Sequence, residues 1–298
     1  MLKLKSVNID LKTVCNKNDK FDSITSWNNL ILVSNKNKHT ILCYEKNSGK
    51  LVHTIGSKGF DYDKFNKPSG LKVINDYLFI VEKDNKRCQI VNMKNKEAIS
   101  YFGFKNLKKP RGIDGLYYKG QYIIFITDEK LETVFKFNIL IKDDEINKIS
   151  SEAFLELSGS KLESVLLDEM NNRLLLADEK KKKINIFSLN GILIKKIENI
   201  FEGTPEDIVK TKNHYIFTDQ VKDNSLFHVY DIKNLNYMHT IYNNLVNNSN
   251  GLHFTDDYLY TIDDYCSIVR FNLKDEKMKM SNLLIIGGLL FAIAHKFI

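Results

Sequence analysis

Charged and amide side chains recur at two kinds of position in this sequence, just after a turn and at the end of an apolar run. After the turns stand Asp22, Arg111, Glu163, Glu206 and Asn250. At the ends of the apolar runs stand Asn35, Lys36, Glu82, Lys83, Asp128, Glu129, Asp178, Glu179, Asp219, Asp263 and Asp264. Carboxylates gathered in one concave surface repel each other unless a cation neutralises them, and oxygen-rich clusters suit Ca²⁺. Lysines and an arginine among them suit a phosphate group.

An Asp at the end of a strand also has an ordinary structural role, because it can cap its own hairpin turn. For any single position this structural alternative is the stronger one. The sequence contains no H-E-x-x-H, C-x-x-C, G-x-S-x-G or P-loop motif. That speaks against a zinc site, a serine hydrolase and a nucleotide-dependent enzyme.

The turn motifs belong to an internal repeat. The segment KPSGLKV, which begins at Lys67, recurs as KPRGIDG, KLESVLL, TPEDIV, NSNGLHF and, more weakly, FDSITSW. The interval is about 40–50 residues, which is typical of repeats built from one blade of a propeller. Each motif precedes a second apolar run such as LFIVEKD, a third such as RCQIVNM and, in most copies, a fourth such as AISYFG. Six such units predict an all-β, six-bladed β-propeller with four-stranded blades.

This architecture explains how the polar residues meet. The innermost strand of a blade begins at one face of the disc, and the second strand returns to that face, so the two sets of residues share one rim around the central channel. The last unit supplies only three strands, and the N-terminal run LKLKSVNIDL alternates apolar and polar residues. We predict that this run is the fourth strand of the last blade and closes the ring. The propeller domain is expected to span residues 1–277.

Bulk properties restrict the partners only loosely. The chain has 298 residues, is 43% hydrophobic and carries a net charge of +7, which is compatible with anionic partners without selecting one. Its four cysteines are scattered and the N-terminus lacks the apolar core of a secretory signal. These features favour reduced thiols in the cytosol and a monomeric propeller.

The C-terminal segment 278–298 differs from the rest. It contains LLIIGGLLFAIA, twelve uncharged residues that are shorter than the roughly 20 of a spanning helix. Flanking lysines can extend a span by reaching toward the lipid headgroups. We predict a membrane anchor with the propeller facing the cytosol. The alternatives are a segment packed on the propeller and a soluble cytoplasmic protein.

The order of these features over about residues 20–265 resembles the β-propeller phytases, which are six-bladed, calcium-dependent phosphomonoesterases. The segments that carry the resemblance are LILVSNKNKHTILCYEKNSGKLVHTI, YIIFITDEKLETVFKFNI, SKLESVLLDEMNNRLLLADEK and TPEDIVKTKNHYIFTDQVKDNSLFHVYDIKN. The resemblance implies that Lys36 or Lys38, and also Lys130, contact phosphate. It also implies that Glu163, Glu179 and Glu206 are calcium ligands.

Several positions depart from the phytase pattern. The glycine that follows two of its glutamates is Ser164 and Asp207 here, and its Asp-Gly in the last blade is Asn250-Gly251. These changes remove carboxylates and weaken the expected metal site. The combined prediction is a phytase-like, calcium-dependent phosphoester hydrolase of a phosphorylated small molecule. Its metal ligands would be Asp22, Glu163, Glu179, Glu206 and Asp219, and its phosphate-holding catalytic residues Lys36, Lys83, Arg111 and Lys130.

Two other functions are compatible with the same rim. The segment GFDYDKFNKPSGLKVINDYLFIVEKDNKRCQIV resembles an NHL repeat, which implies a non-catalytic scaffold that binds a protein at the channel face. Nucleic acid is the less favoured partner. A lactonase-like calcium hydrolase is the third alternative, with Asn35, Asn250 and Asp219 among its ligands.

Overall fold

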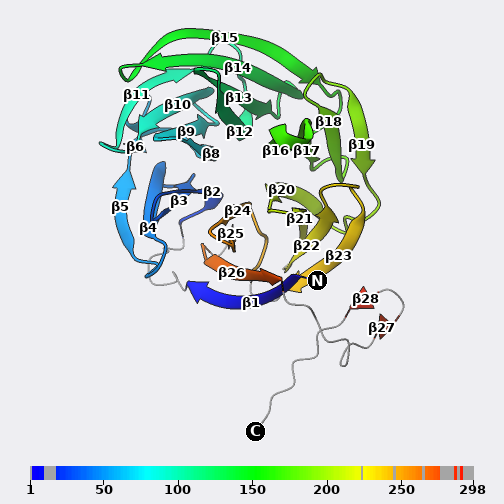
Figure 1. The fold of residues 1–298 in the computed structure, drawn as a ribbon. Coiled ribbons are helices and arrows are strands. Elements are labelled where there is room, and N and C mark those ends of the chain that lie inside the picture. Colours follow the sequence, from blue (N-terminus) through cyan, green and yellow to red (C-terminus); the bar gives the residue numbers. More distant parts are fainter. Residues whose placement is uncertain are drawn as a thin grey trace.

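The chain forms six four-stranded antiparallel sheets set around a central axis (Figure 1). The computed structural model describes residues 2–9, 18–222, 224–243, 246–263, 266–275, 285–286 and 289–290. The inner strands of successive sheets contact one another all the way round, and the last contacts the first. The predicted all-β propeller with six four-stranded blades is therefore confirmed.

We number the blades by their inner strands. Blade 1 consists of β2 (Phe21–Trp27), β3 (Leu30–Asn35), β4 (Thr40–Glu45) and β5 (Leu51–Ile55), and blade 2 of β8 (Pro68–Ile74), β9 (Tyr77–Glu82), β10 (Arg87–Asn92) and β11 (Glu97–Phe102). Blade 3 consists of β12 (Pro110–Tyr118), β13 (Gln121–Asp128), β14 (Thr133–Lys142) and β15 (Glu145–Glu156). Blade 4 consists of β16 (Leu162–Asp168), β17 (Arg173–Asp178), β18 (Lys183–Ser188) and β19 (Leu193–Ile197), with the short 3-10 helix η1 (Glu169–Asn171) after its inner strand. Blade 5 consists of β20 (Thr204–Lys210), β21 (His214–Val221), β22 (Asn224–Asp231) and β23 (Tyr237–Asn243).

Blade 6 combines both ends of the propeller sequence. Its sheet has the order β1-β26-β25-β24, with β24 (Gly251–Thr255), β25 (Tyr258–Ile262), β26 (Ile268–Asp275) and, outermost, β1 (Leu2–Ile9). Most of the predicted membrane anchor, residues 278–298, lies outside the described residues. Within it only β27 (Ile285–Ile286) and β28 (Leu289–Leu290) are described, and they pair with each other. No helix in the described part of the chain is long and apolar enough to cross a membrane.

The hydrophobic core is divided into six clusters, and each cluster fills the space between two neighbouring blades. Successive side chains of a strand point to opposite faces of its sheet. Because both faces of each sheet are covered by a neighbouring blade, each strand contributes apolar side chains to two clusters. Phe79 and Phe217 are fully buried in two of these clusters, where each contributes about 1.5–3 kcal/mol. Cys43 and Cys88 are also fully buried and belong to the core.

A crossover segment on blade 2 is held by a buried charge. Residues 56–67, which include β6 (Ser57–Lys58) and β7 (Lys64–Phe65), connect blade 1 to blade 2. Beneath this segment the Arg87 Nε atom donates to Glu82 at 2.5 Å, and its Nη2 atom donates to the backbone oxygens of Asp61 and Lys64. The guanidinium also lies 4.7 Å from the ring centre of Phe60. The arginine thus ties the crossover to the blade.

Candidate functional site

The rim residues of the channel lie in β-bulges. Five inner strands show a register shift near their start, where two residues have no partner on the second strand; the shift follows the first residue in four of them and the second residue in β20. A bulge re-aims the side chains that it contains, and bulges are common beside functional sites. Each bulge contains two neighbouring residues without a ladder partner. They are Asp22 and Ser23, Ser69 and Gly70, Arg111 and Gly112, Glu163 and Ser164, and Glu206 and Asp207. The start of each inner strand is therefore shaped to present polar groups to the channel.

Hydroxyl groups on the second strands hold three of these bulges in place. The backbone N–H of Gly112 donates to Thr127 Oγ1 at 2.8 Å, and that of Asp207 donates to Thr218 Oγ1 at 2.7 Å. Ser34 accepts the N–H of Ser23 in the same way at 2.9 Å. These contacts replace the ladder hydrogen bonds that a bulge removes, so the bulges are fixed features of the sheet.

Small residues in the bulges allow the blades to approach closely. A Cβ atom on Gly70 would lie 2.5 Å from the carbonyl oxygen of Arg111, and one on Gly112 would lie 2.7 Å from that of Glu163. Both distances are too short for a side chain, so these turn motifs require glycine where the neighbouring bulge presses against them.

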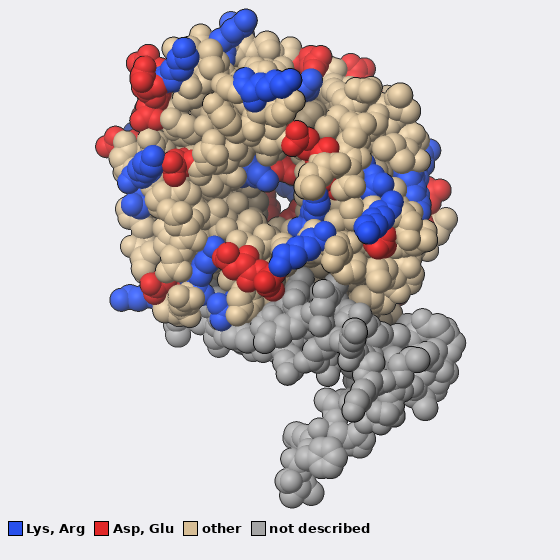
Figure 2. Space-filling model, in the orientation of Figure 1, with Lys and Arg blue, Asp and Glu red and all other residues tan. Residues whose placement is uncertain are grey.

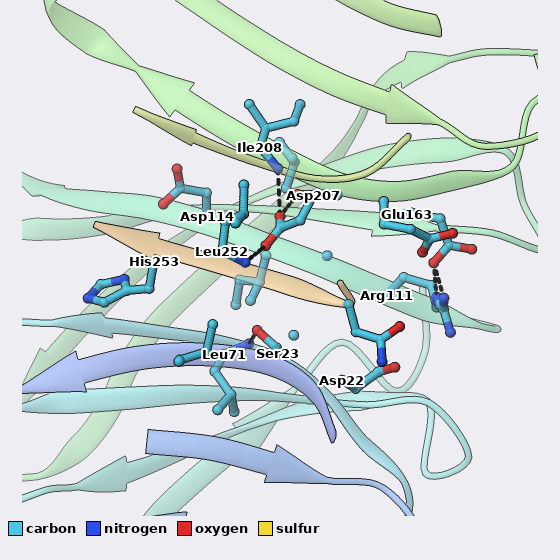
Figure 3. Close-up of a pocket in the computed structure, with 18 of the residues that line it drawn as sticks. Asp22, Ser23, Leu71, Arg111, Asp114, Glu163, Asp207, Ile208, Leu252 and His253 are labelled. Carbon is cyan, nitrogen blue, oxygen red and sulfur yellow. Dashed lines mark hydrogen bonds and ion pairs between the residues drawn. The ribbon is translucent and has the colours of Figure 1, made fainter. Parts of the chain in front are cut away.

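The inner strands enclose a cavity of about 520 Å³ that follows the channel (Figure 3). Figure 2 shows a narrow central opening with both acidic and basic side chains near it. The predicted site residues that line this cavity are Asp22, Lys36, Arg111, Glu163, Glu179 and Glu206. The structure therefore brings together four of the five predicted metal ligands and two of the four predicted phosphate-holding residues.

Most of these rim carboxylates are already paired with a basic side chain. Lys36 forms an ion pair with Asp22, whose other oxygen accepts a hydrogen bond from Ser69 at 2.6 Å. Arg111 binds Glu163 through two nitrogens, as Figure 3 shows. Lys161 bridges the carboxylates of Glu163 and Glu179. The rim is thus neutralised by protein cations.

Glu206 differs from its neighbours. It forms no ion pair among the residues that the structure describes, and its Oε1 atom accepts a hydrogen bond from the Thr204 hydroxyl at 3.3 Å. Burial raises the pKa of Glu206 to about 6, although the positive charges of Arg111 and Lys161 oppose the shift. A carboxyl group with that pKa can take up or release a proton near neutrality.

Asp207, the next residue, is held firmly inside the channel wall. Its carboxylate accepts hydrogen bonds from the Ser164 hydroxyl at 2.5 Å, the Leu252 N–H at 2.7 Å and the Ile208 N–H at 2.8 Å (Figure 3). Burial raises its pKa to about 6 as well. Because these three donors belong to three different blades, the Asp207 side chain links blades 4, 5 and 6.

The residues that end the second strands do not reach the cavity. All six are buried, namely Asn35, Glu82, Asp128, Asp178, Asp219 and Asp263. Asp128, for example, accepts the backbone N–H groups of Lys108 and Lys109 on one side and of Lys130 and Leu131 on the other. They anchor the crossover before the blade and the hairpin turn after it, which is the structural alternative stated above.

Asp219 belongs to this anchoring set, although it was predicted as a metal ligand. It accepts the N–H groups of Glu202 and Gly203, each at 2.9 Å, and contacts His228 Nε2 at 3.2 Å. Unlike the other four predicted ligands, Asp219 does not line the cavity, whereas its neighbour Gln220 does.

Replacing Asp219 with Ala is expected to lower the free energy of unfolding by about 2–4 kcal/mol, because two buried N–H groups lose their acceptor. Urea denaturation measures this, and the exposed Glu202→Ala is the control, with a change below about 0.5 kcal/mol. A variant that keeps its stability but loses calcium affinity would instead return Asp219 to the role of a metal ligand.

The remaining predicted residues lie outside the cavity lining. Lys83 is near the rim of blade 2, with its Nζ atom 3.7 Å from Glu129. Lys130 is exposed in the hairpin turn of blade 3, and its backbone N–H caps Asp128. Several charged residues that line the cavity were missed, among them Lys72, Asp114, Lys161, Asp207 and Lys210. Of these, Asp207 had a signal in the repeat, because it is an acid where the other motifs have Gly or Ser.

The geometry of the rim bears on the predicted calcium site. No group of three or more His, Cys, Asp or Glu side chains in the described part of the chain is arranged to hold a metal ion. The physical reason is the pairing already described, since Lys36, Arg111 and Lys161 occupy the positions beside the carboxylates that a cation would take. The residues present do not fit a calcium centre in this arrangement.

Comparisons with known proteins show the fold alone. No protein-family model and no curated protein sequence matches the chain. Among solved structures, a catalytically inactive virginiamycin B lyase from Staphylococcus aureus with quinupristin is similar, with a TM-score of 0.61 and 15% identity over 92% of this chain and 100% of that chain. A nidogen/laminin complex has a TM-score of 0.57 and 13% identity over 75% and 80% of the two chains. Hydrazine synthase from Kuenenia stuttgartiensis has a TM-score of 0.58 and 12% identity over 81% and 73%.

Proposed function

We propose that this propeller is a hydrolase of a small polar molecule, which binds in the channel mouth and reacts with a water activated by Glu206. One observation carries the proposal: Glu206 lines the cavity, forms no ion pair among the described residues and has a pKa near 6. At neutral pH it is mostly ionised and is suited to act as a general base. Arg111 and Lys161 act on it electrostatically and are placed to hold an anionic group of the substrate.

Phosphomonoesters are the first substrate class to test, because the ordered resemblance to phytases covers most of the propeller and the rim contains cations suited to phosphate. Carboxylic esters and lactones are the second class. A propeller of similar fold is a virginiamycin B lyase whose structure was solved with quinupristin, which supports including organic substrates other than phosphomonoesters in the test. Both classes require a water to be activated, which is the role assigned to Glu206.

The experiment is a turnover assay of the full chain with a phosphomonoester panel and a lactone panel. Each panel is run with added calcium and with a chelator. We expect turnover of at least one class that survives the chelator, because the described carboxylates are neutralised by lysine and arginine. Turnover that requires calcium would overturn the metal-free mechanism, and the absence of turnover in both panels would overturn the hydrolase.

Ring closure by the N-terminal strand is a separate proposal, which the pairing of β1 with β26 supports. Deleting residues 1–9 would expose the edge of β26, and an unpaired edge destabilises a sheet and promotes aggregation. We expect the Tm to fall by about 5–10 °C, which corresponds to a few kcal/mol in a chain of this size. Adding a peptide of residues 1–12 should restore part of the loss, whereas a scrambled peptide should not. An unchanged Tm after the deletion would contradict the closure.

A further inference from the structure

Lys83 lies beside Glu129, Lys109 and Arg111, and of these four residues the proposed hydrolysis uses only Arg111. Its Nζ atom is 3.7 Å from Glu129 Oε2, while Lys109 Nζ is 2.5 Å from the other oxygen of that carboxylate. Arg111 acts on the same carboxylate electrostatically, so three cations surround Glu129. Glu129 Oε2 is buried and has no hydrogen-bond partner among the described residues. Burial raises the pKa of Glu129, but the hydrogen bond from Lys109 and the charges of Lys83 and Arg111 outweigh it and hold the pKa below its ordinary value. Glu129 is therefore ionised, and its Oε2 atom can take up a proton from Lys83 and pass it on.

The surroundings favour the neutral amine of Lys83. Burial and the positive charges of Arg111 and Lys109 lower the pKa of Lys83 to about 8, against the opposing influence of Glu129 and Asp22. At pH 7.5 about a quarter of the Lys83 side chains would be unprotonated, compared with roughly 0.1% for an ordinary lysine. The side chain remains 23% exposed, so a small molecule can reach it. A neutral, accessible lysine amine is a nucleophile toward carbonyl groups.

We propose that Lys83 is a covalent site for small aldehydes or ketones that carry an anionic group, with the imine forming at Nζ and the anionic group held by Lys109 and Arg111. The reaction is a condensation, in which the amine and the carbonyl compound give an imine and one water. The nitrogen lone pair attacks the carbonyl carbon, and one proton passes from nitrogen by way of Glu129 Oε2 to the alkoxide oxygen, which gives a carbinolamine. A second proton then passes from nitrogen by the same route to the hydroxyl group, which leaves as water while the C=N bond forms. Neither an oxidant nor a reductant is consumed.

Pyridoxal 5′-phosphate is a suitable probe, because it combines an aldehyde with a phosphate. The full chain is incubated with it at pH 8, the imine is reduced with borohydride, and the labelled peptides are identified by mass spectrometry. We expect Lys83 to be labelled at least about ten times faster than Lys130, an exposed lysine in the corresponding turn of the next blade. Inorganic phosphate should slow the labelling by competing for Lys109 and Arg111.

Two variants sharpen the test. Lys83→Arg keeps the charge and should abolish the fast label, whereas Lys130→Arg should leave it intact. Glu129→Gln should slow imine formation several-fold at pH 9, where the amine is mostly neutral in both proteins and the proton transfer is isolated. Labelling of Lys83 at the rate of Lys130, or a fast label that survives Lys83→Arg, would overturn the proposal. An unchanged rate of imine formation in Glu129→Gln would overturn the role of Glu129. The readout is a mass, so it is independent of whether the hydrolase proposal holds.

Discussion

Glu206→Gln is expected to lower kcat about 100-fold or more on any substrate that the propeller turns over. A positioned general base contributes about 10²–10⁴-fold to a rate, and glutamine cannot accept the proton. Gln keeps the size of the side chain and its contact with Thr204, so the free energy of unfolding should change little. KM should also change little, because Arg111 and Lys161 would still hold the substrate.

The pH profile distinguishes this catalytic role from a structural one. Burial raises the pKa of Glu206 to about 6, so the base is protonated below that pH and ionised above it. The kcat/KM of the natural protein should therefore rise through pH 6 and level off near pH 7. In Glu206→Gln this rising limb should disappear from the residual activity.

Glu202→Gln is the matched control, since Glu202 is an exposed acid in the same crossover. It should leave kcat, KM and the pH profile unchanged. Retention of full activity by Glu206→Gln, or a rising limb that persists in it, would contradict the assignment of Glu206 as the base.

Arg87→Met is expected to lower the free energy of unfolding by about 3–5 kcal/mol. Both partners of the Arg87–Glu82 pair are fully buried, and removing one partner leaves the other as an uncompensated buried charge. The variant also releases the crossover of residues 56–67, because the Nη2 contacts with Asp61 and Lys64 are lost. Urea denaturation, with the slope compared between variants, measures the effect.

The loss should depend on pH. Burial already raises the pKa of Glu82 above its ordinary value despite Arg87, and removing the arginine raises it further. A folded-state pKa above the unfolded one means that the folded protein holds the proton more tightly, so stability falls as the pH rises through that range. The deficit should therefore be larger at pH 8 than at pH 5.

Glu82→Met combined with Arg87→Met should recover part of the loss, because no charge then remains buried. Lys86→Met, in the exposed turn beside Arg87, should change stability by less than about 0.5 kcal/mol. A loss equal at both pH values, or a double variant no better than Arg87→Met, would show that the crossover contacts dominate over the buried charge.

The number of blades could be predicted from sequence because each blade repeats the same order of a turn motif and alternating apolar runs. The motif KPSGLKV and its relatives mark the start of every inner strand, and the following runs end where the structure ends its second strands. The rim positions of Asp22, Arg111, Glu163 and Glu206 follow from that repeat, and all four line the cavity.

Which residues at the strand ends are buried anchors and which line the cavity could not be predicted in the same way. Asp219 and Gln220 are neighbours, yet the first is buried against backbone N–H groups and the second lines the cavity. Successive residues of a strand point to opposite sides, so the choice between them depends on register, and the bulge in the adjacent inner strand decides that register. The pairing of Lys161 with Glu163 and Glu179 likewise depends on how two strands align, which a repeat pattern does not specify.

The buried residues that end the second strands have a consequence for how such a protein can change. Asp128, Asp178 and their counterparts bind the backbone N–H groups of the adjoining loops. The residue that follows Asp128 or Asp178 is therefore not needed for this anchoring. Exchanges at positions 36, 83, 129 and 179 therefore alter ion pairs of the channel mouth and leave the buried scaffold beneath in place, with positions 83 and 129 changing together because their side chains meet between two blades. A gene library randomised at these four codons should yield mostly folded propellers that differ in what they recognise.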